Sequence, residues 1–110
     1  MSVKLIVLYP YPQDQAAFEK AYTTEHIPMV ATIARKSGRC TKAIYTRVLM
    51  SPEGASPFYR IAELHYPSLE AMQADLSTPE AQALGAHAVS ISTGGPAISL
   101  VCDEDTISFE

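Results

Sequence analysis

The sequence contains no tryptophan and only two cysteines in 110 residues, and no apolar run approaches the roughly 20 residues that would cross a bilayer. Cys40 and Cys102 lie far apart and form no C-x-x-C pair, which disfavours both a zinc site and a secreted disulfide framework. Basic residues are also few, and the net charge of −4 disfavours nucleic acid as a partner. Because no A-x-A-like cleavage site follows the apolar start, we expect a cytoplasmic protein with no membrane segment.

Motifs for nucleophilic and phosphate chemistry are absent as well. The chain has neither a G-x-S-x-G elbow nor a glycine-rich P-loop, and nothing in it predicts a bound cofactor. What it does have is 47% hydrophobic residues, which is enough to bury a core without disulfides or metals. The length predicts one domain that spans residues 1–110.

Apolar periodicity and turn residues divide the chain into strands and helices. Residues 3–9 are almost entirely apolar, as is typical of a central strand, and Asp14 is the expected N-cap of a first helix that Pro28 ends or kinks. The order strand, helix, strand, strand, helix, strand predicts an α+β ferredoxin-like βαββαβ fold, with both helices on one face of an antiparallel sheet. The later segments are strands at 41–50 and 58–66, helices at 68–76 and 79–90, and a last strand at 96–102.

The most informative stretch lies in the first predicted helix. Phe18, Tyr22 and His26 recur every four residues, so their side chains stack on one helical face. Histidine is the side chain that titrates nearest neutral pH, and it follows a tyrosine by one turn here. On this stretch alone the pattern favours a core helix with a partly buried, hydrogen-bonded histidine, and a site for a small molecule is the alternative.

The third predicted strand has two unlike faces. Tyr59, Ile61, Glu63 and His65 alternate on the face that points away from the predicted helices. Since this face is too apolar to be left in water, we expect a second copy of the sheet to cover it. The sequence therefore predicts a homodimer in which two sheets face each other, as a dimeric α+β barrel.

Taken together, several motifs resemble those of the EthD family, which is named after a protein of ethyl tert-butyl ether degradation and belongs to the dimeric α+β barrel proteins. The resemblance covers nearly the whole chain. It rests on the strand at 4–9, the motif Phe18-x3-Tyr22-x3-His26-x-Pro28-Met29, the strand motif at 59–66, Ser77-x-Pro79-Glu80 and Thr93-Gly94-Gly95. His87 departs from the pattern, because an acidic residue is expected at that position.

The resemblance implies a small protein without an organic cofactor that acts in or alongside the oxidative degradation of a small organic compound. Its expected partners are a second copy, a small hydrophobic molecule and a pathway oxygenase. Relatives in the wider group include cofactor-free monooxygenases, which are oxidoreductases, as well as dehydratases, isomerases and haem-degrading enzymes. An enzyme of these classes that uses His26 as acid or base is the alternative.

His26, Tyr22 and Glu63 are the candidate catalytic residues. We expect His26 to exchange a proton, Tyr22 or Tyr59 to donate a hydrogen bond to a carbonyl, and Glu63 to orient the imidazole. That set suits proton transfer next to a carbonyl, or cofactor-free oxygenation of a phenolic compound. The candidate ligand-binding residues are Tyr9, Phe18, Tyr59, Ile61 and His65.

Other interpretations of the same residues stay open. A non-catalytic carrier predicts the same cavity without a functional pH dependence, and a structural dimer predicts no cavity. A metal or haem site built from His26, Glu63 and His65 has a possible ligand set but no ligand-spaced motif, so no metal is predicted.

Overall fold

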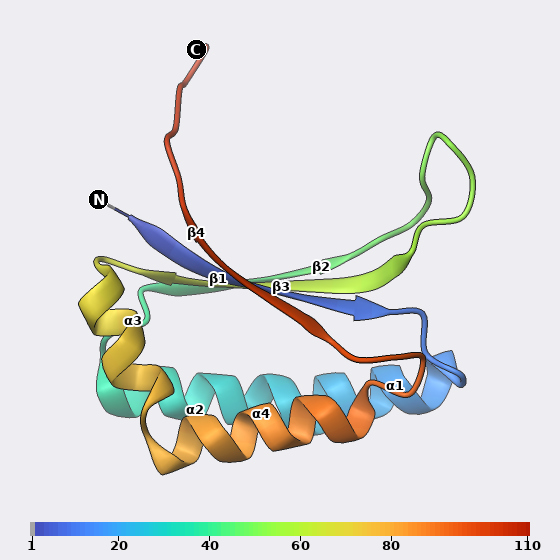
Figure 1. The fold of residues 1–110 in the computed structure, drawn as a ribbon, viewed down its shortest axis with the longest axis horizontal. Helices are drawn as coiled ribbons and strands as arrows, with labels where there is room; N and C mark the ends of the chain where they lie inside the picture. The colour runs from blue at the N-terminus through green and yellow to red at the C-terminus, as the bar shows by residue number, and fades with distance from the viewer. Residues whose placement is uncertain (1) are drawn as a thin grey trace.

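The computed structural model describes residues 2–110 as a four-stranded sheet with its helices on one face (Figure 1). The strand order is β2-β3-β1-β4 and every pairing is antiparallel, which confirms the predicted α+β ferredoxin-like fold. The strands are β1 (Val3–Pro10), β2 (Lys42–Arg47), β3 (Phe58–Tyr66) and β4 (Ile98–Asp103). The helices are α1 (Gln15–Ala21), the π-helix η1 (Tyr22–His26), α2 (Ile27–Ser37), α3 (Leu69–Leu76) and α4 (Pro79–Ile91).

The central strand β1 carries the apolar run expected of it. Leu5 pairs with Leu64 of β3 on one side and with Val101 of β4 on the other, so these side chains share the face that meets the helices. Strands β2 and β4 are the two edges of the sheet. Cys40 and Cys102 are both free thiols.

Three helices begin at side-chain caps that the sequence predicts. Asp14, Ser68 and Thr78 each accept a hydrogen bond from the backbone N–H three residues later. Each such bond satisfies one of the first N–H groups of a helix, which have no partner within the helix. The two outer strands are shorter or shifted relative to the prediction, because the chain leaves β2 after Arg47 and enters β4 only at Ile98.

The first helix does not end at Pro28. It passes through the π-helix η1 and continues as α2, with Pro28 in the first turn of α2. A π-helix pairs each N–H with the carbonyl five residues back, and Ile27 N–H donates to the Tyr22 carbonyl in this way. Proline has no N–H to place in this pattern, so the widened turn accommodates the ring without breaking the helix.

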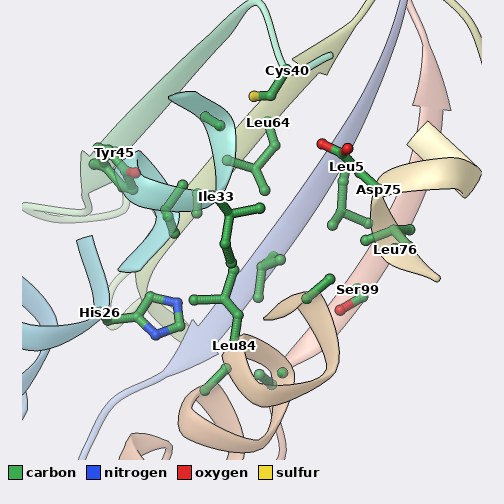
Figure 2. Close-up of a pocket in the computed structure, with 18 of the residues that line it drawn as sticks. Leu5, His26, Ile33, Cys40, Tyr45, Leu64, Asp75, Leu76, Leu84 and Ser99 are labelled. Atoms are coloured by element: carbon green, nitrogen blue, oxygen red, sulfur yellow. The ribbon is translucent and has the colours of Figure 1, made fainter. Parts of the chain in front are cut away.

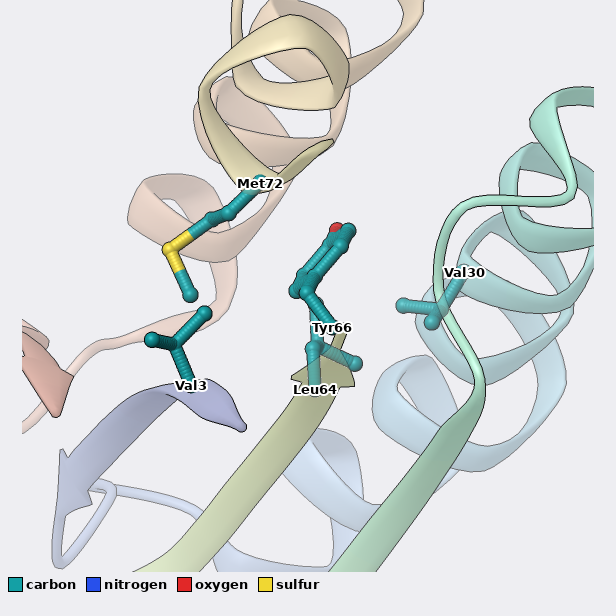
Figure 3. Packing of buried hydrophobic residues seen from close by; sticks show 5 residues of the cluster. All are labelled: Val3, Val30, Leu64, Tyr66 and Met72. Atoms are coloured by element: carbon teal, nitrogen blue, oxygen red, sulfur yellow. The ribbon is translucent and has the colours of Figure 1, made fainter. Parts of the chain in front are cut away.

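The core consists of two clusters between the sheet and the helices. Figure 3 shows the first, in which Tyr66 of β3 lies among side chains from β1, α2 and α3. The second cluster is aromatic and lies toward α1. The first comprises Val3, Val30, Leu64, Tyr66 and Met72, and the second Tyr9, Phe18, Tyr22, Tyr59 and Ile91.

Gly94, between α4 and β4, packs against the backbone of Tyr11, between β1 and α1. We expect Gly94→Ala to lower the free energy of unfolding by about 1–3 kcal/mol. A Cβ at this position would overlap the carbonyl oxygen of Tyr11, which is backbone and cannot rotate away. Gly85→Ala is the matched control, because a Cβ there meets nothing within 4 Å and alanine favours the helix by about 0.5–1 kcal/mol. Urea unfolding of both variants measures the difference, and equal stabilities would contradict the close approach.

Candidate active site

An apolar cavity of about 300 Å³ lies between the sheet and the helices (Figure 2). In this view His26 stands at one side of the cavity and Asp75 at the other. Aliphatic side chains of β1, β3, α2 and α4 form most of the wall between them, among them Leu5, Val7, Val30, Ile33, Leu64 and Leu84. The cavity is also lined by residues with polar side chains, among them Tyr9, His26, Tyr45, Tyr66, Asp75 and Ser99.

The π-helix holds His26 in this wall. The imidazole is 5% exposed and stacks on the Tyr22 ring at 5.6 Å, as Tyr22 stacks on Phe18 at 5.3 Å. The predicted common face of these three residues is therefore present. The Nε2 atom of His26 lies 3.3 Å from the hydroxyl of Tyr9, which also lines the cavity.

A second histidine completes the arrangement. His87 of α4 meets the edge of the His26 ring, with ring centroids 5.1 Å apart and the two ring planes within 16° of each other. The two Nδ1 atoms are 2.9 Å apart, and Nε2 of His87 lies 3.2 Å from the carboxylate of Glu25. The sequence predictions assign no role to His87 or Glu25, although His87 departs from the EthD pattern.

Burial sets the proton affinities at this end of the cavity. Desolvation, with a smaller contribution from the nearby His87, lowers the pKa of His26 to about 4. Desolvation also raises the pKa of Tyr9 well above its ordinary value. At neutral pH the site therefore holds an uncharged imidazole beside a protonated phenol, which is the pairing of a base with a hydrogen-bond donor.

The other two candidate catalytic residues lie elsewhere. Tyr22 is fully buried behind the His26 ring, and within residues 2–110 no hydrogen-bond partner reaches its hydroxyl. Glu63 is directly opposite Ile6 on the sheet face away from the helices, where its carboxylate accepts a hydrogen bond from Lys4 at 3.0 Å. Glu63 thus cannot orient the imidazole, because the sheet separates the two side chains. His87 occupies that place instead.

Of the five candidate ligand-binding residues, Tyr9 lines the cavity. Phe18 packs beneath it, and Ile61 and His65 share the outer sheet face with Glu63 by strand alternation. Tyr59 was expected on that outer face but packs against Phe18 at 5.8 Å. The register shifts at this point, since Tyr9 pairs with Arg60 and Pro10 with Phe58, so the alternation does not carry through Tyr59.

The metal or haem site built from His26, Glu63 and His65 does not form, because the sheet separates His26 from the other two side chains. His65 lies beside Glu104 at 3.2 Å and Glu63 at 3.6 Å, all on the far side of the sheet from His26. In the part of the chain that the structure describes, no group of three or more His, Cys, Asp or Glu side chains is arranged to hold a metal ion. None of the helices within residues 2–110 is both long and apolar enough to cross a membrane.

The family model of the EthD domain matches residues 10–91. The chain belongs to the EthD domain family. An uncharacterised 11.0 kDa protein from the thcB–thcC intergenic region of Rhodococcus erythropolis is 31% identical over 110 residues, covering 94% of this chain and 96% of that protein. An EthD family crystal structure from Bacillus halodurans is 33% identical, with a TM-score of 0.84 over 96% of this chain and all of that one.

Two more distant structures share the fold alone. A dimeric ferredoxin-like protein from Jannaschia sp. is 12% identical, with a TM-score of 0.77 over 94% of this EthD chain and all of that one. The cofactor-independent oxygenase SnoaB of Streptomyces nogalater is 14% identical, with a TM-score of 0.67 over 99% and 98% of the two chains.

Proposed function

We propose that this EthD protein binds a small hydrophobic organic molecule in its cavity and uses His26 to take a proton from it. The observation that carries the proposal is the position of His26, which lines an otherwise largely apolar cavity and whose Nε2 lies 3.3 Å from the Tyr9 hydroxyl. An uncharged imidazole in such a place can act as a base toward a ligand in the cavity.

Tyr9 supplies the second group that this chemistry needs. When a base removes a proton next to a carbonyl, negative charge develops on the carbonyl oxygen, and a nearby O–H donor stabilises it. Burial keeps the Tyr9 phenol protonated, so its hydroxyl can turn from His26 to that oxygen. Tyr9 therefore takes the role that the sequence suggested for Tyr22 or Tyr59.

The wall of the cavity restricts the ligand. Most of the lining is aliphatic or aromatic, and a volume of about 300 Å³ accommodates one or two fused rings. Isomerisation, dehydration and cofactor-free oxygenation of such a molecule all begin with loss of a proton. We place the protein in or alongside oxidative degradation, with a pathway oxygenase as a possible neighbour in that pathway; the fold shared with a cofactor-independent oxygenase supports this proposal.

The proposed unit is a homodimer. Ile6, Leu8, Ile44, Ile61 and Leu100 lie on the sheet face away from the helices, and two of them, Ile44 and Leu100, are 39% and 45% exposed. The loop between β2 and β3 and the segment after β4 both rise from this side of the sheet (Figure 1). A second copy would bury the apolar face, and the dimeric neighbour supports this arrangement.

Binding of the bicyclic ketone 2-tetralone tests whether the cavity is the site. We expect Ala88→Leu to weaken binding at least about tenfold, because Ala88 lines the cavity and a larger side chain fills it. Ala86→Leu is the matched control, since Ala86 lies two residues along the same helix and is exposed. Ligand-observed NMR titration gives both affinities.

Equal losses in the two variants would place 2-tetralone elsewhere on the protein. Binding by the wild type without any exchange of the ketone's acidic protons would instead favour a non-catalytic carrier.

A further inference from the structure

A continuous row of polar groups leads from the cavity to the surface. Tyr9 and His26 are buried, the His87 side chain is 19% exposed and the Glu25 side chain is 61% exposed. The row has three contacts, of 3.3 Å from Tyr9 to His26, 2.9 Å from His26 to His87 and 3.2 Å from His87 to Glu25. Each contact joins ring nitrogens or oxygens that can exchange a proton.

The carboxylate at the end of the row fixes the direction of every hydrogen bond. An ionised Glu25 can only accept, so Nε2 of His87 must carry the proton between them. In an uncharged His87 the Nδ1 atom is then an acceptor, and Nδ1 of His26 must be the donor across the 2.9 Å contact. This leaves Nε2 of His26 without a proton, as an acceptor for the Tyr9 hydroxyl.

We propose that His87 and Glu25 are positioning residues that hold His26 in its Nδ1–H tautomer. The cavity then binds carbon or oxygen acids, and the proton that His26 removes from them leaves through His87. The inference rests on the proposed role of His26 as a base and names its ligand class. A bound carboxylate does not suit this site, because an anion needs a donor where His26 presents a lone pair.

The proton transfer balances along the row. The C–H or O–H bond of the ligand breaks, its electron pair stays on the ligand, and an N–H bond forms at Nε2 of His26. The proton on Nδ1 of His26 moves to Nδ1 of His87, and Nε2 of His87 releases its own proton to Glu25 or to water. His26 ends uncharged, and the ligand anion remains in the cavity beside the Tyr9 hydroxyl.

Protonation of His87 reverses the direction of the hydrogen bond between His87 and His26. A cationic His87 donates from both nitrogens, so Nδ1 of His26 becomes the acceptor and Nε2 of His26 carries the proton. The titratable groups that contact the His87 ring are His26 and Glu25, both of η1. One proton bound near the surface thereby converts the buried His26 from a base to an acid without charging it.

Nitrogen-15 NMR of the histidine rings in the ligand-free protein tests this directly. At about pH 8.5 we expect His26 to be protonated on Nδ1 and not on Nε2. At lower pH, once the same spectra show a cationic His87, we expect His26 to be protonated on Nε2 while it is still uncharged. A His26 that is protonated on Nε2 at pH 8.5 overturns the inference.

Two variants test whether the hydrogen bonds of this row, and not the packing around the ring, fix the tautomer of His26. Glu25→Gln replaces the obligatory acceptor by a group that can also donate, and His87→Phe keeps a flat aromatic ring without its nitrogens, so we expect His26 to lose its single tautomer in both. Glu25→Asp should restore it, and Glu70→Gln, at an exposed helical position away from the row, should leave it unchanged. An unchanged His26 in both Glu25→Gln and His87→Phe also overturns the inference. Because no ligand is used, failure here is distinct from failure of 2-tetralone to bind, which concerns the proposed function alone.

Discussion

Replacing His26 by glutamine is expected to slow the exchange of the C1 protons of 2-tetralone for deuterium by about 10²- to 10⁴-fold. These protons lie next to a carbonyl, so their exchange reports the removal of a proton by a base in the cavity. Glutamine keeps a polar group that can reach the Tyr9 hydroxyl but cannot take up a proton at this pH. The measurement is the loss of the C1 proton signal by NMR in heavy water at about pH 8.5.

His65→Gln is the matched control for this experiment. His65 is as buried as His26, at 5% exposure, but lies on the opposite face of the sheet. We expect the exchange rate of this variant to equal that of the wild type. If His26→Gln also exchanges the ketone protons at the wild-type rate, then His26 is a structural histidine and the proposed chemistry is wrong.

Alanine at position 26 is a poorer test of the same point. It would leave a void beside the stacked Tyr22 ring and a buried Tyr9 hydroxyl without its partner, which costs about 1–3 kcal/mol. A loss of exchange in that variant would combine lost chemistry with lost stability. Urea unfolding of His26→Gln therefore accompanies the rate measurement.

Ile61→Lys is expected to convert the protein from a dimer to a monomer at micromolar concentration. Ile61 lies directly opposite Leu8 and Thr46 near the middle of the open sheet face, so in a dimer its side chain would meet the partner's sheet. A lysine there would place a buried charge against the apolar side chains around Leu8 in a dimer, while in the monomer it reaches water freely. Light scattering coupled to size-exclusion chromatography measures the mass.

Ala83→Lys introduces the same charge on the exposed surface of α4 and should leave the dimer intact. Circular dichroism of Ile61→Lys shows whether the monomer retains its fold. A wild type that is monomeric at micromolar concentration, or an Ile61→Lys variant that stays dimeric, would contradict dimerisation through this face.

The sequence by itself determined the order of the elements, the helix caps and the common face of Phe18, Tyr22 and His26. These features depend on residues within about one helical turn of one another, or on strict alternation along a strand. Asp14 caps through Ala17 and Ser68 through Ala71, in each case over three residues. Since such contacts are fixed by local geometry, the spacing of residue types was enough to place them.

Only the tertiary structure decided which side chains meet His26. Its partners Tyr9 and His87 are 17 and 61 residues away in the sequence, and they reach it because the sheet covers the π-helix and α4 packs beside it in the same helical layer. The register shift at Tyr59 likewise turned one tyrosine toward the helices, against simple alternation. The spacing of residues along one strand or one helix does not specify how separate elements are rotated and set against each other, because that is fixed by packing over the whole domain.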